Sequence, residues 1–516
     1  MKIISLIFLI LFLFVQDALS NNIQVSNVRL TGQNTTNDFT FVQFDIEWEN
    51  SWRYAGGPAN WDAAWLFIKF RIGSAGAWQH VYLNDTGHTT CDGATIVNGL
   101  LSPGVPYNNS SNPSLGVFLH RSSPGSGTFV CGDVKLRWNY GTNMVADNDE
   151  IDIQVFAIEM VYVPQGNFYV GSGGSESGAF YTYPTTTSAY QITSESAIIV
   201  GTSTGNLYYT NTSGTSGDQL GPVPASYPKG YNAFYVMKYE LSQKAYLDFL
   251  NSLTRAQQIN RVRSDISGTT ASFEYAMANY FEPLARNGIR SFTALPPAPA
   301  VVNLFCDINI NIIPNESGDG LGIPNTFMNH GDITAYLDWA GLRLMTEFEF
   351  EKCGRGPKTP LANEYAWGTN ILYKNVNLTN SNLPTEIPSE YYSNSPFASG
   401  PLRNGAFARS NSTRELAGAG YYGCMDLSGN LLEMGCSIGH PNGRAYTGVH
   451  GNGMITTSGA ADVVNWPTST GIFLRGGTYT TADITQERLS DRFRANTTTG
   501  SNPEDIGARG VRTAEP

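Results

Sequence analysis

Residues 420–434 of the chain read GYYGCMDLSGNLLEM, and residues 473–479 read FLRGGTY. Further blocks accompany these two in the C-terminal two-thirds of the sequence. They are MVYVPQGNFYVGS from Met160, FYVMKYELSQKAYLDFLNSLT from Phe234, DITAYLDWAGLRLMTEFEFEKCGRG from Asp332, YAWGTN from Tyr365, RFRAN from Arg492 and GARGVRT from Gly507. Together these blocks decide the fold, because several motifs in a fixed order are far more specific than any one of them.

The blocks resemble the formylglycine-generating-enzyme family, also called the sulfatase-modifying factor family. The resemblance implies an α+β, mostly irregular domain of the C-type-lectin-like kind, with short helices set among Gly-rich segments. Hydrophobic spacing supports two such helices independently. In residues 332–341 the apolar positions recur at helical intervals and Gly341 follows as a terminator. Residues 346–349 read TEFE, a capping box that opens the next helix.

In this family, oxidation of a substrate cysteine depends on two closely spaced cysteines that hold a copper ion. The pair follows the motif that is matched here by residues 476–479. Soft thiolate ligands are what retain Cu(I). In this chain the first cysteine position falls at Thr481 and the second near Ser490, and the last cysteine of the sequence is Cys436. The sequence therefore predicts neither copper binding nor formylglycine formation.

The resemblance also implies structural calcium. Its first loop supplies side-chain oxygens and backbone carbonyls, the hard donors that Ca²⁺ prefers. The matching side chains are Asp426 and Glu433, and the matching carbonyls are those of Leu427, Gly429 and Leu431. A second, poorer match uses Asn377 and the carbonyl of Leu378, with other ligands near residues 404–406. The alternative at both places is a turn whose polar groups bond only to backbone.

Two other groupings were weighed as metal sites. The acidic residues Asp147, Asp149, Glu150 and Asp152 cluster near the end of the N-terminal region, where they predict either a calcium site or a solvated turn. His440 and His450 share one Gly-rich loop and could meet at a surface metal. Both interpretations are weaker than the first calcium loop.

The N-terminal region, residues 21–155, reads as a series of strands. Period-two alternation, aromatic and β-branched residues, and turn residues between the runs predict an antiparallel, all-β sandwich of the immunoglobulin-like kind. Residues 156–516 form the second expected domain. It is interrupted at about 171–226 by a segment dense in Gly, Ser, Thr and Tyr, which we expect to be a surface insertion.

Composition and the N-terminus bear on the location of the protein. Residues 1–20 carry one Lys, an apolar run and the sequence Ala-Leu-Ser, which predicts a cleaved signal peptide and a secreted or cell-surface protein. No later stretch is apolar enough to predict a membrane span. The formal charge of −12, with only 14% charged residues, disfavours nucleic acid as a partner.

Six cysteines are too few for a disulfide scaffold, but export allows bridges to persist. Cys91 and Cys131 both fall in the N-terminal region, where a bridge between them is plausible. Cys306, Cys353, Cys424 and Cys436 allow three connectivities, among which the sequence does not choose, or they are small buried apolar side chains.

The resulting hypothesis is a non-catalytic binding or assembly protein built on a formylglycine-generating-enzyme-like domain. Expected partners are a cell-envelope protein, a glycan or other copies of the chain. The tyrosines of the insertion offer aromatic contact area, or they are core residues. The alternative is an oxidoreductase of the same superfamily that uses a site without copper thiolates, because fold resemblance alone does not decide function.

Overall fold

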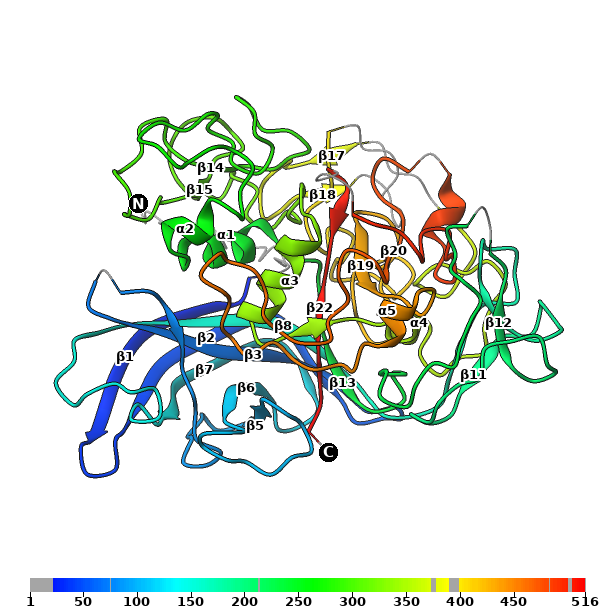
Figure 1. Cartoon of the computed structure of the whole chain (residues 1–516), viewed down its shortest axis with the longest axis horizontal. Helices are drawn as coiled ribbons and strands as arrows, with labels where there is room; N and C mark the ends of the chain where they lie inside the picture. The colour runs from blue at the N-terminus through cyan, green and yellow to red at the C-terminus, as the bar shows by residue number, and fades with distance from the viewer. Residues whose placement is uncertain are drawn as a thin grey trace, which may run out of the picture.

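The structure is a computed structural model of the 516-residue chain. It describes residues 22–74, 76–211, 214–372, 377–388, 399–481, 483–499 and 504–515. The predicted signal peptide, residues 1–20, lies outside the described residues. In Figure 1 the long strands of the N-terminal region lie along the bottom, and the irregular C-terminal region sits above them.

Strands dominate the regular structure. The N-terminal region contributes β1 (Gln24–Asn34), β2 (Phe39–Tyr54), β3 (Asn60–Ile72), β4 (Gln79–His80), β5 (Ala94–Leu100), β6 (Ser114–Arg121), β7 (Gly125–Trp138) and β8 (Ile151–Val163). Shorter strands follow: β9 (Phe168–Val170), β10 (Phe180–Thr182), β11 (Tyr190–Ile192), β12 (Leu207–Tyr209), β13 (Phe234–Met237), β14 (Ile289–Arg290), β15 (Phe305–Cys306), β16 (Arg343–Leu344), β17 (Leu378–Thr379), β18 (Ile387–Pro388), β19 (Leu432–Cys436), β20 (Ile472–Arg475), β21 (Ile506–Gly507) and β22 (Gly510–Thr513).

Helices are few and short in the described part of the chain. They are α1 (Gln243–Asn251), α2 (Arg255–Gln258), α3 (His330–Trp339), α4 (Glu347–Arg355), α5 (Pro441–Arg444) and the 3₁₀ helix η1 (Ile484–Glu487). The two helices expected from spacing are confirmed as α3 and α4. The predicted capping box at Thr346 and Glu349 is present, and Gly341 follows α3 with a φ of 67°. A mostly sheet structure with few helices is therefore what these residues form.

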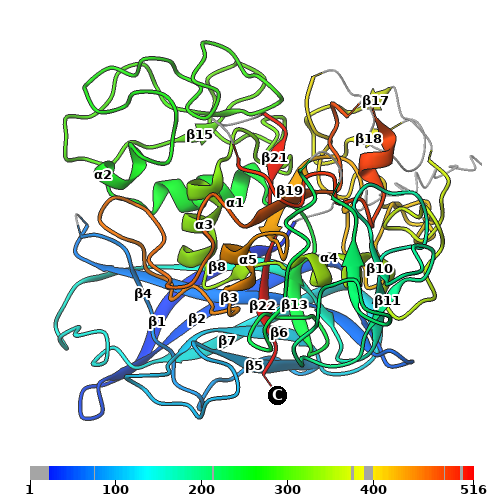
Figure 2. The same ribbon diagram turned by 45° about the vertical axis from the view of Figure 1, so that its right-hand side comes forward.

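One sheet of eleven strands connects the two regions. Its main series of hydrogen-bonded strands runs in the order β1-β2-β3-β8-β13-β22-β16, and in addition β7 pairs with β2 and β6 pairs with β3. The layer β1-β2-β7 folds over the layer that contains β6, β3 and β8, and this arrangement encloses the N-terminal core. The immunoglobulin-like topology stays a prediction, because the second layer does not end with the N-terminal region but continues through β13 and β22 (Figure 2).

Strand β3 belongs to two cores at once, because successive side chains of a strand point to opposite faces. Its residues Ala64, Leu66, Ile68 and Phe70 pack with β2 and β7 in the N-terminal core. Its residues Ala63, Trp65 and Phe67 pack with the C-terminal region. Polar contacts reinforce the second face: Trp65 Nε1 donates to the Ala340 carbonyl at 2.8 Å, and Lys69 Nζ donates to the Trp339 carbonyl at 2.7 Å.

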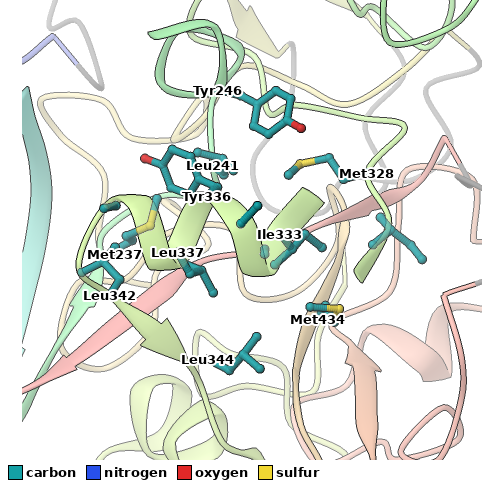
Figure 3. Close-up of a cluster of buried hydrophobic side chains, with 14 of the residues drawn as sticks. Met237, Leu241, Tyr246, Met328, Ile333, Tyr336, Leu337, Leu342, Leu344 and Met434 are labelled. Carbon is teal, nitrogen blue, oxygen red and sulfur yellow. The ribbon is translucent and has the colours of Figure 1, made fainter. Parts of the chain in front are cut away.

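Helix α3 is the centre of the larger core. Asn329 and Asp332 form its capping box, and the side chains of Ile333, Tyr336 and Leu337 are almost completely buried. In Figure 3 these side chains are surrounded by residues from several elements, including Met237 of β13 and Met434 of β19. The core therefore holds together segments that are distant in sequence and have little regular structure of their own.

The expected boundary between residues 155 and 156 falls inside β8. Residues 62–72 of β3 pair with residues 151–161 of β8 in eleven residue pairs, and residues 160–163 of the same strand pair with β13. No linker separates the two regions within residues 22–74 and 76–211, because they share this strand. The division into two domains stays a prediction, and β8 runs continuously across the expected boundary.

The insertion at about 171–226 contributes to the core more than expected. Tyr209 is completely buried and Tyr181 is 7% exposed. The guanidinium of Arg492 lies 3.9 Å from the ring centre of Phe180 and 4.3 Å from that of Tyr209. Phe180 and Tyr209 therefore connect the insertion to Arg492 in the C-terminal segment. Of the two interpretations of the insertion's tyrosines, Tyr181 and Tyr209 fit buried core residues and not exposed contact area.

The bridge between Cys91 and Cys131 is present, which confirms that pairing. The other four cysteines are buried and have free thiols. Among the helices in the described ranges, none is both long and apolar enough to cross a bilayer.

Candidate functional site

A buried polar network on helix α4 includes Ser490, one of the two positions to which the family resemblance assigns a cysteine. Glu351 Oε1 accepts from Arg475 Nη2 at 3.0 Å, and its Oε2 accepts from Arg355 Nη1 at 3.0 Å and from the backbone N–H of Gly171 at 2.7 Å. The Ser490 hydroxyl donates to Glu351 Oε2 at 2.9 Å. We call Glu351, Arg355, Arg475 and Ser490 the Glu351 cluster, and the side chains of its three charged members are fully buried.

The two positions to which the family resemblance assigns cysteines, Thr481 and Ser490, hold hydroxyl side chains that accept hydrogen bonds from the protein. Ser490 also accepts a hydrogen bond from Arg355 Nη2 at 2.7 Å. Thr481 Oγ1 accepts from the backbone N–H of Thr478 at 2.9 Å. Although burial alone would raise the pKa of Glu351, Arg475 and Arg355 lower that pKa below its usual value. The cluster is therefore one carboxylate held between two guanidiniums, and its hard oxygen donors do not suit Cu(I).

The remaining thiols do not replace the missing pair. Cys306, Cys353, Cys424 and Cys436 are all completely buried, and burial raises the pKa of Cys306, Cys353 and Cys436. Cys436 lies in β19 and its Sγ contacts the Gly443 carbonyl at 3.3 Å. Reactive cysteines need access to solvent or substrate, and all four thiols are buried.

The first predicted calcium loop is intact in sequence, but its carboxylate is engaged. Glu433 lies in β19, and both of its oxygens accept from Arg509, with Nε at 2.6 Å and Nη2 at 2.5 Å. Asp426 has a φ of 61°, and its Oδ2 accepts from the backbone N–H of Gly405 at 2.7 Å. The two predicted side-chain ligands are therefore held by different partners.

Two of the three predicted carbonyl ligands, those of Leu427 and Leu431, lie close to Gly476. A Cβ added to Gly476 would stand 2.9 Å from the Leu427 oxygen and 3.8 Å from the Leu431 oxygen. The backbone N–H of Gly429 donates to the Gly476 carbonyl at 2.6 Å. The loop thus has converging carbonyls, which suit Ca²⁺, but the carboxylate that should join them is paired with Arg509. The donor set fits calcium only in part, and calcium binding stays a prediction.

A third carboxylate, that of Glu240, accepts hydrogen bonds from two residues of this loop. It accepts from the backbone N–H of Leu431 at 2.9 Å and from the side-chain amide of Asn430 at 2.5 Å. Burial, and then the neighbouring Glu433 and Asp426, raise the pKa of Glu240 well above its usual value. Burial also raises the pKa of Asp426, to about 6. Sequence reasoning missed Glu240, which lies in the FYVMKYELSQ block, because no local motif links it to a loop so distant in sequence.

The second predicted calcium site, at Asn377 and Leu378, stays a prediction. Asn377 is exposed, and Leu378 lies in β17, where it pairs with Pro388. Asn404, from the segment expected to complete the site, donates its side-chain amide to the Glu240 carbonyl at 2.9 Å. This amide therefore serves the first loop, although the prediction for Asn377 and Leu378 is not tested by these contacts.

The weaker metal groupings are also dispersed among other contacts. Asp147 accepts from the Tyr140 hydroxyl at 2.6 Å, and Asp152 pairs with Arg71 at 2.7 Å. His440 accepts from the Asn442 N–H, and His450 Nε2 accepts from the Thr513 N–H at 3.0 Å. Throughout the described ranges, no three His, Cys, Asp or Glu side chains are arranged to hold a metal ion.

A cavity of about 640 Å³ lies where the N-terminal strands meet the C-terminal region. We call it the junction cavity. Its lining includes three cationic and four aromatic side chains: Lys238, Arg409, Arg414, Trp52, Tyr239, Tyr421 and Tyr422. None of the described residues that line it is acidic, although the whole chain carries a formal charge of −12. The cavity is therefore suited to an anionic ligand with apolar surface.

Two cationic side chains of the junction cavity, Lys238 and Arg414, are fixed by contacts with other residues. Lys238 Nζ pairs with Glu159 at 3.0 Å and lies 5.1 Å from the ring centres of both Trp52 and Tyr239. Burial alone would lower the pKa of Lys238, but Glu159 and other neighbours raise it above its usual value. Arg414 Nη2 donates to the carbonyls of Gly354 and Ala366, both at 2.7 Å. Sequence reasoning missed this cavity because its lining comes from four separate segments.

Comparison with known proteins identifies the family to which the chain belongs. The family model for the sulfatase-modifying factor enzyme 1-like domain matches residues 152–514. No curated protein matches the chain. Among solved structures, one similar chain is the Major Tropism Determinant U1 Variant, at 13% sequence identity and a TM-score of 0.20, with 68% of this chain and 72% of that chain covered. At that score the alignment bears on neither fold nor function. The matched residues begin at the start of β8, the strand shared by the two regions.

Proposed function

Because the chain belongs to the sulfatase-modifying factor enzyme 1-like domain family, we propose that it is a binding protein that keeps the family fold without cysteine oxidation. One observation carries the proposal: Thr481 and Ser490 stand where the thiolate pair is expected, and Ser490 is fixed between Glu351 and Arg355. A soft metal has no thiolate to bind there, and a hydroxyl buried between charges is not open to a substrate.

The chemical half of this proposal predicts no aldehyde product. A Cys-x-Pro-x-Arg peptide incubated with the full mature chain, Cu(I) and oxygen should remain unmodified by mass spectrometry. An active family enzyme treated identically provides the positive control. An aldehyde formed by this chain would contradict the proposal.

The binding half rests on the junction cavity. Its cations, tyrosines and amide side chains complement a ligand that carries carboxylates on a partly apolar framework, such as an acidic glycan of the cell envelope. Exposure to such a ligand follows from the signal peptide predicted at residues 1–20, which would place the mature chain outside the cell. The ligand is therefore an acidic saccharide met at a cell surface, and the C-terminal region serves as a rigid platform for it.

Calorimetry with oligogalacturonate tests this half, with cellohexaose as the neutral comparison. The wild-type chain should bind the acidic oligosaccharide and not the neutral one. Arg414→Gln should weaken binding at least tenfold, which corresponds to about 1.4 kcal/mol. The matched control is Tyr54→Ala, since Tyr54 is a 58% exposed aromatic residue outside the cavity lining. Equal binding by both variants would contradict a role for the cavity.

A further inference from the structure

The strand β19 carries a carboxylate that is neutralised by the chain itself. Glu433 is completely buried, between β20 on one side and β21 on the other. Arg509 lies between β21 and β22, so the end of the sheet brings its guanidinium to this carboxylate. The two side chains meet in a two-pronged contact, Nε to Oε2 at 2.6 Å and Nη2 to Oε1 at 2.5 Å. Such a planar fork is the preferred geometry of an arginine with a carboxylate.

The rest of the guanidinium is surrounded by backbone oxygens. Nη2 also donates to the Met425 carbonyl at 2.7 Å, and Nη1 donates to the carbonyls of Met237 at 3.3 Å and Lys238 at 3.2 Å. All five N–H donors of Arg509 therefore have an acceptor. One carboxylate and three carbonyls thus surround a positive charge. Glu433 is the one donor that this set shares with the predicted calcium site, whose carbonyls are those of Leu427, Gly429 and Leu431.

We infer that Arg509 is the resident cation of this loop and takes the place at Glu433 that the family resemblance assigns to calcium. Each oxygen of Glu433 already accepts one hydrogen bond from the guanidinium, so a metal could use only the lone pairs that remain beside this positive charge. A divalent ion bound beside Arg509 would also meet a like charge in a buried setting, where screening is weak. The inference is independent of the proposed function, because it concerns the closure of the loop and not the junction cavity.

The remaining contacts of the loop agree with closure by the protein. Asp426 bonds to the N–H of Gly405, Gly429 bonds to Gly476, and Glu240 bonds to Leu431 and Asn430. Each of these contacts ties the loop to a different segment. Hydrogen bonds to three other segments therefore hold the loop.

Thermal unfolding of the full mature chain tests the inference without any variant. The melting temperature should be the same, within about 1 °C, in 5 mM CaCl₂ and in EDTA. If it rises in calcium, Glu433→Gln and Asp426→Asn are measured. A rise that persists in these variants places calcium elsewhere and supports Arg509 at Glu433. A rise that is lost in either folded variant overturns the inference.

Removing the resident cation gives the complementary test. Arg509→Ala leaves Glu433 unpaired, so we expect a lower melting temperature that calcium raises by several degrees. Arg509→Lys keeps the charge but not the fork, and it should show a smaller calcium response than Arg509→Ala. A calcium response in the wild type equal to that in Arg509→Ala would overturn the inference. If Arg509→Ala does not fold, the wild-type titration above still decides the question.

Discussion

The N-terminal and C-terminal regions use charged side chains in opposite ways. The ion pairs between two N-terminal strands or their turns are exposed or partly exposed: Arg29 with Asp133 at 46% and 74%, and Arg71 with Asp152 at 26% and 47%. The C-terminal region contains arginine–glutamate pairs in which both side chains are no more than 1% exposed. These are Arg343–Glu349, Arg355–Glu351, Arg475–Glu351, Arg492–Glu347 and Arg509–Glu433.

The difference follows from where each region finds partners for its backbone. The N-terminal strands satisfy their N–H and C=O groups in long ladders, such as the eleven pairs of β3 with β8. The strands of the C-terminal region are short, so many of its buried carbonyls need donors other than a neighbouring strand. Arginine supplies them: Arg475 donates to the Leu489 carbonyl at 2.6 Å, and Arg355 donates to the Tyr169 carbonyl at 2.7 Å. Buried guanidiniums thus supply hydrogen bonds to backbone carbonyls in the irregular region, as strand pairing does in the N-terminal region.

The largest effect should come from removing a carboxylate shared by two guanidiniums. Glu351→Ala leaves Arg355 and Arg475 buried without their partner, so it should lower the free energy of unfolding by about 3–5 kcal/mol. Urea unfolding followed by circular dichroism measures the loss. The matched control, Arg71→Ala, removes an exposed pair and should cost about 0–1 kcal/mol. Similar losses for the two variants would remove the contrast between the regions.

The N-terminal region should depend instead on its covalent bridge. The bridge closes a loop of 40 residues between Cys91 and Cys131, and its loss should cost about 2–4 kcal/mol. Reductant should therefore lower the melting temperature of the wild type. The double variant Cys91→Ser, Cys131→Ser should melt at this lower temperature with or without reductant. A wild type whose melting temperature ignores reductant would show that the bridge contributes nothing.

The smallest expected effect concerns a single buried carboxyl at the contact between the regions. Burial raises the pKa of Asp338 to about 7, and its oxygens accept from the N–H groups of Asn452 and Asp462. A carboxyl whose pKa is raised on folding adds stability at low pH, and that stability is lost as the pH rises through about 7. Asp338→Asn does not titrate. Its stability relative to the wild type should therefore improve between pH 5 and pH 8, by up to about 2 kcal/mol.

Urea midpoints of both proteins at pH 5, 6, 7 and 8 measure this difference. A constant cost of the amide shifts every midpoint equally, so only the change of the difference with pH is diagnostic. A difference that stays flat across the series would contradict the raised pKa of Asp338.

Local patterns in the sequence predicted local structure well. The capping box at Thr346, the termination of α3 before Gly341 and the bridge between Cys91 and Cys131 are all present. The first two features depend on a few neighbouring residues. The bridge joins the two cysteines of the N-terminal region, which allow one pairing within it. The family followed from the order of its blocks, which is also a property of the sequence alone.

Contacts between distant segments were not predictable in the same way. Arg509 and Glu433 are separated by 76 positions, and nothing local marks either one as the partner of the other. The run AAWLFIKF in β3 did carry a signal, because a strand that is apolar on both faces is buried on both faces. Interpreted as simple alternation, it led to a separate sandwich with a boundary inside β8.

The strand shared by the two regions also determines how the molecule responds to tension. Force applied between the N-terminal strand β1 and the C-terminal strand β22 crosses β2, β3, β8 and β13 of one sheet. No extensible linker lies on that route within residues 22–74 and 151–163, so the two regions cannot be drawn apart before strands slide or peel. A chain tethered at a surface by one region would therefore transmit the pull directly to the other through rows of hydrogen bonds.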